Sequence, residues 1–324
     1  MSDRYARQEI LPEVGAEGQR KLATATVLVV GAGGLGCAVL QYLTAAGVGS
    51  LIVVDPDRVE ESNLHRQPLY RMSDIGQPKA AAARASLAAL NPAIRIEALC
   101  ERFSSVNAAH LVEAANVVID AADSFAVTYL LSDTCQGAGK PLVSASVLGL
   151  AGYVGAFCGG APSYRAVFPE LPHSAGSCAE SGVLGTAVGV LGTLEAHLAL
   201  ALLLDWQPRV LGRMLSLDLR TLHVGGFSFT AATESREPVI PFIAPAELES
   251  TDIIIDLRSP AEAPVSPFPS ALRIEVDALE HAKLQFPGGA RVVLCCRSGL
   301  RAWRAARALR NQGHEKLALI ALGD

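Results

Sequence analysis

Near the end of this 324-residue chain, Cys296 begins the sequence Cys-Arg-Ser-Gly-Leu-Arg, and the run at 291–294 leads through Cys295 directly into it. The run predicts a buried strand, and residues 302–312 predict a helix. A cysteine at a strand end, joined to a helix by a six-residue loop, lies near backbone N–H groups and the positive end of the helix dipole. Together with Arg301, these groups stabilise a thiolate and cradle an anion or a persulfide. The C-R-S-G-x-R pattern is fairly specific, because phosphatase loops, its main rival, usually need C-x5-R.

Three glycines form a second signature, since Gly31, Gly33 and Gly36 have the spacing G-x-G-x-x-G. They follow a β-branched run at 27–30, which predicts a strand buried on both faces. Such glycines permit a tight turn and a close approach of the backbone to a phosphate. Asp55 ends the next predicted strand, at the place where an acidic residue reaches a ribose hydroxyl. The pattern predicts a nucleotide site but does not separate a dinucleotide from ATP.

Polar residues crowd into the segment after Asp55, where a dehydrogenase would usually continue with a helix and a strand. Arginine and lysine so close behind a nucleotide strand suit a triphosphate with several negative charges. The candidate ligands of the nucleotide in this segment are Asp57, Asn63, Arg66, Gln67 and Lys79.

Asp123 is a candidate metal ligand. It follows an apolar strand predicted at 117–121, and the carboxyl edge of a parallel sheet is where ligands bind. A carboxylate there can hold a Mg²⁺ ion that bridges phosphates. The sequence is equally compatible with an alternative, in which Asp123 caps a helix at 125–135.

Cys178 lies in the Ser/Gly-rich stretch HSAGSCAESGVLG, ahead of a long apolar segment. A cysteine in a flexible loop is a candidate accessible thiol, although a lone cysteine is more often structural. The chain has seven cysteines and no C-x-x-C pair, which indicates a reducing compartment.

Composition bears on the partners and the location of the protein. The net charge is -5 and no basic run is concentrated, which argues against nucleic acid. The N-terminus lacks the apolar core of a signal peptide. The most apolar segment, 183–204, contains Glu195, His197 and three glycines, so we expect a buried helix rather than a membrane span. We therefore expect a cytoplasmic protein that does not bind membranes.

Domain organisation follows from the alternation of helical and apolar segments. Residues 1–25 are polar and mostly helical, and composition alone favours a solvated arm over one that covers a site on this or a neighbouring subunit. Residues 229–242 shift to Ser, Thr, Glu and Pro, the composition of a linker. We expect an α/β chain with one domain at 1–228 and a smaller one at 243–324. Further strands are predicted at 51–54, 94–98, 142–145, 152–157, 215–218, 222–227 and 253–256, and further helices at 37–46 and 79–90.

Motifs in the first domain resemble those of the ThiF/MoeB adenylyltransferases, relatives of the ubiquitin-activating enzymes. They are RYARQ, VLVVGAGGLG, VVDPDRVEESNLHRQ, IGQPK, DAADS, PLVSASVLG and SCAESGVLG, in the order of the family. In the second domain, IIIDLRS and CCRSGLRA resemble a rhodanese-like sulfurtransferase. The resemblance implies a Rossmann-like nucleotide-binding domain with a mixed sheet, followed by a small, shortened α/β rhodanese-like domain.

The resemblance also implies a role for each candidate residue. The glycines at 31, 33, 34 and 36 would take the phosphates of ATP, Asp55 the ribose, and Asp123 the Mg²⁺ ion. Arg7 would reach across a homodimer into the partner's site. Cys178 matches the cysteine of a mobile loop, and Cys296 the persulfide cysteine. Phosphate contacts would come from Asn63, Arg66 and Lys79.

The implied reaction is the ATP-dependent adenylation of a ubiquitin-like sulfur carrier that ends in Gly-Gly, followed by sulfur transfer to give a thiocarboxylate. The sulfur would come from a persulfide-bearing desulfurase or from thiosulfate. Two alternatives remain. One is a non-catalytic or adenylation-only module that recruits the carrier, and the other, supported only by the glycines and Asp55, is an NAD-dependent oxidoreductase.

This chain departs from the family pattern at three places. Relatives carry two C-x-x-C pairs for a structural Zn²⁺, but the first pair here is Ser163-Tyr164-Arg165-Ala166 and the second is missing, so we expect no zinc. The family's Asp-Asn pair at the magnesium position is Asp123-Ser124. The rhodanese-like part stops at Leu322-Gly323-Asp324, where such domains usually add a helix, and this shortening is expected to weaken sulfur transfer.

Overall fold

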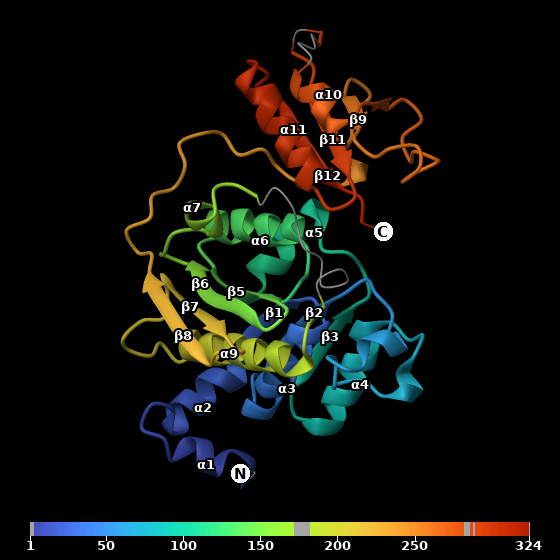
Figure 1. The fold of residues 1–324 in the computed structure, drawn as a ribbon. Coiled ribbons are helices and arrows are strands. Elements are labelled where there is room, and N and C mark those ends of the chain that lie inside the picture. Colours follow the sequence, from blue (N-terminus) through green and yellow to red (C-terminus); the bar gives the residue numbers. More distant parts are fainter. Residues whose placement is uncertain (1–2, 172–181, 282–285, 288, 324) are drawn as a thin grey trace.

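Two β-sheets organise the chain in the computed structural model (Figure 1), which describes residues 3–171, 182–281, 286–287 and 289–323. The larger sheet has eight strands in the order β3-β2-β1-β4-β5-β6-β7-β8. Strands β1 to β5 run parallel, and β6 to β8 continue the sheet in antiparallel pairs. The strands are β1 (Thr26–Val30), β2 (Ser50–Val54), β3 (Arg95–Leu99), β4 (Val117–Asp120), β5 (Pro141–Leu148), β6 (Ala151–Cys158), β7 (Arg213–Asp218) and β8 (His223–Ser228).

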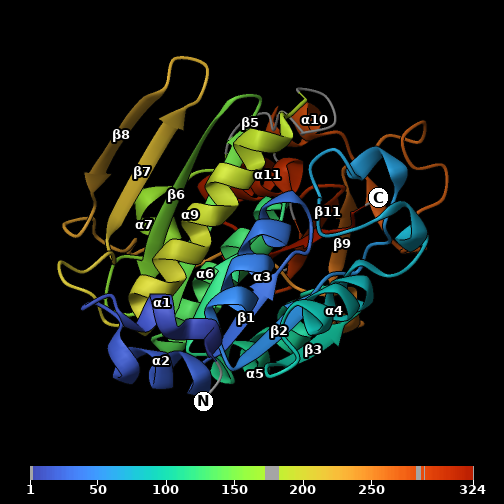
Figure 2. The same ribbon diagram turned by 90° about the horizontal axis from the view of Figure 1, so that it is seen from below.

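Helices cover both faces of this sheet because strand β1 is apolar on both sides. Val27 and Val29 point into one core, and Leu28 and Val30 into the other. Helices α3 (Gly34–Ala46) and α9 (Gly185–Leu203) lie side by side on the first face (Figure 2), with α4 (Lys79–Leu90) next to α3. The other face carries α5 (Ser105–Glu113), α6 (Phe125–Ala138) and the short α7 (Tyr164–Val167).

The N-terminal segment packs beyond the C-terminal end of α3. It comprises η1 (Asp3–Tyr5), α1 (Ala6–Glu9) and α2 (Gly15–Thr24). Gln8 and Gln19 both donate hydrogen bonds to the carbonyl of Ala46, at 3.0 and 3.1 Å. This segment is therefore attached to the domain, whereas composition alone favoured a solvated arm. Two short 3₁₀ helices, η2 (Glu61–Asn63) and η3 (Met72–Asp74), lie between β2 and α4.

The second sheet is parallel, with the order β10-β9-β11-β12. Helix α11 packs against this sheet. The sequence predicted β9, β11 and α11, but it did not predict the short elements β10, α10 and β12. Strand β11 includes Cys296 and α11 begins at Leu300, so only residues 297–299 separate them, fewer than the six expected. Gly299, with φ of +87°, allows this abrupt entry into the helix. The elements are η4 (Pro245–Glu247), β9 (Ile253–Asp256), β10 (Leu272–Arg273), α10 (Val276–His281), β11 (Val292–Cys296), α11 (Leu300–Asn311) and β12 (Leu317–Ala321).

The segment between the sheets, expected to be a linker, is anchored by buried residues at both of its ends. Phe229, Ile240 and Phe242 are each buried, and they belong to an apolar cluster that spans both domains. Helix α11 approaches α6 and α7 from above in Figure 1. The two domains are thus packed together rather than joined by a free tether.

Helix α9 is the one helix of the described chain that is long and apolar enough to cross a membrane by length and composition. It packs instead against α3 and strands β4, β5 and β6, as a core helix of the domain. Its Glu195 is fully buried, and neither carboxyl oxygen has a hydrogen-bond partner among the described residues. Burial raises the pKa of Glu195 well above its ordinary value, and the buried Asp120 adds to the shift.

The variant Glu195→Gln is expected to be more stable than the wild type at alkaline pH. A carboxyl group with a raised pKa in the folded state stabilises the fold only while it is protonated. The stability is therefore fully present below the unfolded-state pKa of about 4.3 and is lost as the pH rises toward the folded-state value. We expect a gain of about 1–3 kcal/mol in unfolding free energy at pH 8 and little gain at pH 4. Urea denaturation at both pH values measures this difference, and a gain independent of pH would contradict it.

Candidate active site

The glycine turn lies at the carboxyl edge of the large sheet, between β1 and α3. Gly31 has φ of +101°, and a Cβ there would lie 2.5 Å from the carbonyl oxygen of Ala121 on the adjacent strand end. A Cβ on Gly36 would collide with the carbonyl of Gly31. Only glycine therefore fits at these two positions. The N-terminus of α3, with Gly33 at its N-cap, is left open to an anion.

Asp55 holds this turn to β2. Its carboxylate accepts hydrogen bonds from the N–H groups of Ala32 and Asp57, at 2.7 and 2.8 Å. Burial raises its pKa, although these two backbone bonds and Lys79 oppose the shift. Asp55 thus has a structural role in addition to any contact with a ribose.

The structure brings the polar residues of the next segment to the same turn. A Cβ on Gly33 would lie 3.8 Å from Nε2 of Gln67, and one on Gly34 would lie 3.6 Å from Cγ of Arg66. Gln67 is buried, its Nε2 donates to Asn63 at 3.4 Å, and its Oε1 has no partner among the described residues. A buried amide oxygen without a partner at a glycine turn is a group that a ligand can satisfy.

Lys79 supplies a buried positive charge at the start of α4. Its Nζ lies 2.9 Å from Oδ2 of Asp57, whose side chain is 64% exposed, while that of Lys79 is 8% exposed. The pair therefore presents a desolvated ammonium group held by a carboxylate that faces solvent. Such a lysine interacts strongly with a phosphate because water screens it poorly.

Asp123 lies on the turn after β4, across the sheet edge from Asp55. Ser124 occupies the N-cap of α6, so the alternative in which Asp123 caps this helix is wrong. Asp123 is exposed, whereas Asp120 below it is fully buried and accepts hydrogen bonds from Ser144 Oγ at 2.9 Å and the N–H of Ala122 at 3.3 Å. Burial raises the pKa of Asp120 to about 6. Asp120 thus fixes the turn that presents Asp123.

Cys296 is the last residue of β11 and is fully buried. Its Sγ accepts hydrogen bonds from the N–H groups of Gly299, at 3.2 Å, and Ala302, at 3.4 Å. These are the groups that the loop pattern predicted at the start of α11. The neighbouring Cys295 points into a different apolar cluster, and burial raises the pKa of its thiol to about 12. The two vicinal thiols are therefore chemically distinct.

Arg301 interacts with Cys296 and also donates hydrogen bonds to two other acceptors, Glu262 and Leu257. Its guanidinium forms a two-point ion pair with Glu262, at 2.7 Å for one pair of atoms, and donates to the carbonyl of Leu257 at 3.1 Å. The bond to Glu262 is the main cause that raises the pKa of Arg301, and Cys296 contributes less. Sequence reasoning did not identify Glu262, because the residue lies 39 positions away in an irregular segment.

Two predicted residues lie apart from these groups. Arg7 is exposed on α1, beside the C-terminal end of α3. The 13-residue helix α3 is roughly 18 Å long, so Arg7 is far from the glycine turn of its own chain. Cys178 lies outside the described residues.

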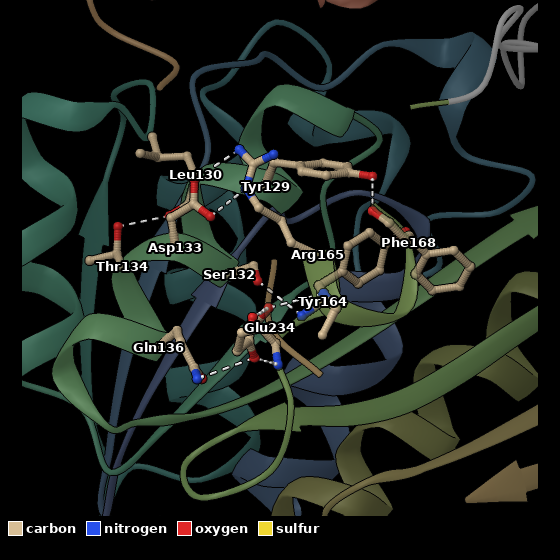
Figure 3. Close-up of polar contacts among 12 residues, drawn as sticks. Tyr129, Leu130, Ser132, Asp133, Thr134, Gln136, Tyr164, Arg165, Phe168 and Glu234 are labelled. Carbon is tan, nitrogen blue, oxygen red and sulfur yellow. Dashed lines mark hydrogen bonds and ion pairs between the residues drawn. The ribbon is translucent and has the colours of Figure 1, made fainter. Parts of the chain in front are cut away.

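The corner at 163–166, where relatives are expected to place zinc ligands, is held by hydrogen bonds (Figure 3). Glu234, from the segment between the domains, accepts from the backbone N–H and the Oγ of Ser163, both at 2.7 Å, and from Gln136 at 3.3 Å. Ser163 Oγ also accepts from the N–H of Ala166 at 3.1 Å. The described residues contain no cluster of three or more metal-ligating side chains. Nothing in the sequence indicated this role for Glu234, because it is one acidic residue in a segment that was predicted to be a linker.

The variant Glu234→Ala is expected to lower the free energy of unfolding by about 1–2 kcal/mol, because Ser163 would lose two charge-assisted hydrogen bonds near the surface. The conservative variant Glu234→Gln should recover part of this loss. Zinc chelation with phenanthroline should leave the melting temperature of the wild type unchanged. A fall in melting temperature on chelation would show that a metal holds this corner.

Together, the fold and the two candidate sites define a two-domain α/β protein, with a glycine turn at the edge of a mixed sheet and a buried cysteine at a helix N-terminus on a parallel sheet. The chain belongs to the ThiF family, whose model matches residues 5–238, and a model of the rhodanese-like domain matches residues 244–323. The protein is accordingly an ATP-using adenylyltransferase with a sulfurtransferase-type domain.

Two relatives illustrate the similarity. The sulfur carrier protein adenylyltransferase of Thermus thermophilus is 45% identical over 247 residues, which cover 74% of this chain and 89% of the relative. The adenylyltransferase and sulfurtransferase MOCS3 of Sus scrofa is 38% identical, over 86% of this chain and 70% of that protein. Among solved structures, E. coli MccB with ATP has a TM-score of 0.62 at 21% identity, over 71% of this chain and 72% of that one, and supports the fold alone.

Proposed function

We propose that this protein adenylates the C-terminal glycine carboxylate of a ubiquitin-like sulfur carrier and then transfers sulfur from Cys296 to give a thiocarboxylate. A free carboxylate resists nucleophilic attack and must first be activated. One carboxylate oxygen attacks the α-phosphorus of ATP, which forms the acyl-adenylate and releases pyrophosphate. The observation that supports this proposal is the glycine turn, which lies against the end of β4 ahead of Asp123, while Asp55 bonds both to that turn and to Asp57, the partner of Lys79.

Each group at this edge has a distinct part in the first step. The backbone at the four glycines, 31, 33, 34 and 36, and the N-terminus of α3 would bind the phosphates, while Asp55 would bind the ribose. Lys79, oriented by Asp57, would stabilise the charge that develops as pyrophosphate leaves. The other proposed phosphate contacts are Asn63, Arg66 and Gln67.

Asp123 would hold a Mg²⁺ ion. An exposed carboxylate on a turn fixed by a buried neighbour fits this ion, which prefers oxygen ligands and keeps several waters. When bound, the ion would supply positive charge to the phosphates. Ser124, at the position of the family's asparagine, offers a hydroxyl in place of an amide.

In the second step, the terminal sulfur of a Cys296 persulfide attacks the acyl carbonyl. AMP leaves, and an acyl disulfide then joins the carrier to Cys296. A thiol attacks the Cys296 sulfur of that bond, which releases the thiocarboxylate and leaves a disulfide that a second thiol reduces. Cys178 is the candidate thiol within the chain, and dithiothreitol can act in its place in vitro. A persulfide-bearing desulfurase or thiosulfate would reload Cys296.

The enzyme is proposed to act as a cytoplasmic homodimer. Arg7 is too far from the glycine turn of its own chain to serve it, and this supports a contribution to the partner's site. Ile10 and Leu11 on the same segment are 78% and 50% exposed, which suits an interface. The proposed domains are residues 1–228 and 243–324.

ATP–pyrophosphate exchange in the presence of a Gly-Gly-ended carrier tests the proposed function. Exchange that depends on the carrier is expected, followed by a mass shift from carboxylate to thiocarboxylate when thiosulfate and dithiothreitol are added. Exchange without thiocarboxylate formation would support the alternative of an adenylation-only module. The absence of exchange with every carrier of the source organism would refute the proposal. Titration with NAD(H) should give no change in protein fluorescence.

A further inference from the structure

The C-terminal domain is attached to the adenylyltransferase domain through a stacked cluster that contains Arg165, one of the residues at the corner 163–166. Arg165 forms a two-point ion pair with Asp133, at 2.6 and 2.9 Å. Its guanidinium lies over the ring of Tyr129, 4.6 Å from the centroid, and 5.3 Å from the ring centroid of Trp303 on α11. Figure 3 shows Arg165 between Asp133 and Tyr129. Arg165 thus joins a buried face of α6 to a helix of the other domain.

Ion pairs extend this contact along α11. Trp303 is buried, and its Nε1 donates to Glu170 at 3.4 Å. Arg307 pairs with Glu170 at 2.7 Å and with Glu237 at 3.0 Å. Arg310 donates to the carbonyl of Pro238 at 2.7 Å. Successive turns of α11 are therefore fixed to the first domain and to the segment between the domains.

A second contact lies at the other end of the interface, beside the sulfur loop. Arg297, in that loop, accepts a backbone hydrogen bond from Gly323 at 2.9 Å. A Cβ on Gly323 would lie 2.5 Å from Arg102, which follows β3. The carbonyl of Leu99, the last residue of β3, accepts a hydrogen bond from the N–H of Asp55 at 3.1 Å. The cysteine loop is therefore connected to the nucleotide edge by a short series of direct contacts.

We infer that Arg165 and Trp303 are positioning residues for sulfur transfer, which hold the Cys296 loop toward the carboxyl edge of the large sheet. Two separate contacts hold this domain against the first one, and an apolar cluster that spans both domains lies between them. A nucleophile in a fixed orientation reacts faster than a tethered one, because folding has already removed the translational and rotational entropy that the reaction would otherwise lose. Arg165, at the corner where the family resemblance led us to expect a zinc-ligand pair, would thus help to couple the two half-reactions. This inference rests on the proposed function.

The variants Trp303→Ala and Arg165→Ala test this inference in the full-length protein. Three rates are measured: carrier-dependent ATP–pyrophosphate exchange, sulfur transfer from thiosulfate to cyanide, and thiocarboxylate formation in single turnover. We expect the first two to stay within about twofold of the wild type and the third to fall about tenfold or more. The conservative Trp303→Phe should restore most of the third rate. Trp206→Ala is the matched control, because that tryptophan contacts Glu13 at the opposite end of the sheet.

The outcomes separate the inference from the function on which it rests. If the wild type forms no thiocarboxylate, the proposed function fails and the inference with it. If the wild type forms it and Trp303→Ala forms it equally fast, only the inference is overturned. If Trp303→Ala loses all three activities, the variant Glu170→Ala is the deciding test. Glu170 is exposed, so its removal breaks the bonds to Trp303 and Arg307 without leaving a cavity in the core. A selective loss of thiocarboxylate formation in that variant supports the inference, and an unchanged rate overturns it.

Discussion

The variant Asp123→Ala is expected to lower the rate of carrier-dependent ATP–pyrophosphate exchange by about 100-fold or more. Asp123 is exposed at the end of β4, on a turn that the buried Asp120 holds through the N–H of Ala122. Its side chain has no part in the apolar core, so its removal should not alter the fold. Loss of the carboxylate would remove the proposed Mg²⁺ ligand and expose the phosphates to uncompensated repulsion. Exchange of labelled pyrophosphate into ATP measures the loss.

Glu113→Ala is the matched control for this variant. Glu113 is an exposed carboxylate at the end of α5, and the chain continues from there to the start of β4, at the opposite edge of the sheet. Its exchange rate should equal that of the wild type. An Asp123→Ala enzyme with more than about half of the wild-type exchange rate at saturating Mg²⁺ would contradict the assignment.

The variant Cys296→Ala is expected to abolish thiocarboxylate formation and to leave ATP–pyrophosphate exchange unchanged. Cys296 Sγ accepts two backbone hydrogen bonds at the N-terminus of α11, and these place two N–H donors beside the sulfur. The glycine turn and Asp123 belong to the other domain, so the first half-reaction should not depend on this thiol. Mass spectrometry of the carrier distinguishes carboxylate, adenylate and thiocarboxylate.

Cys295→Ala is a demanding control because the two cysteines are adjacent. Burial raises the pKa of Cys295 to about 12, which disfavours its thiolate at neutral pH. This variant should form thiocarboxylate at a rate close to that of the wild type. If Cys295→Ala loses the activity and Cys296→Ala keeps it, the assignment of the persulfide is wrong.

Much of the fold was predictable because its signals are local in the sequence. The glycine spacing and the β-branched runs predicted β1, α3 and β2, and the alanine-rich run predicted α4 with the bounds observed. Cys296 and its loop were likewise recognisable, since the N–H donors that contact the sulfur come from the six residues that follow it. The short strands β10 and β12 were missed because a few apolar residues have no distinct period.

The sequence by itself thus indicated the order of the two domains and the candidate residues for nucleotide binding and for sulfur transfer. The tertiary structure decided what depends on residues far apart in the chain. It pairs Arg301 with Glu262, attaches Glu234 to Ser163, and stacks Arg165 on Trp303 across the domain interface. Ion pairs and stacking contacts of this kind produce no recognisable pattern in the sequence, because each partner alone is an ordinary polar or aromatic residue. The sequence therefore specified the candidate residues of each domain, and only the tertiary structure showed that α11 packs against the first domain.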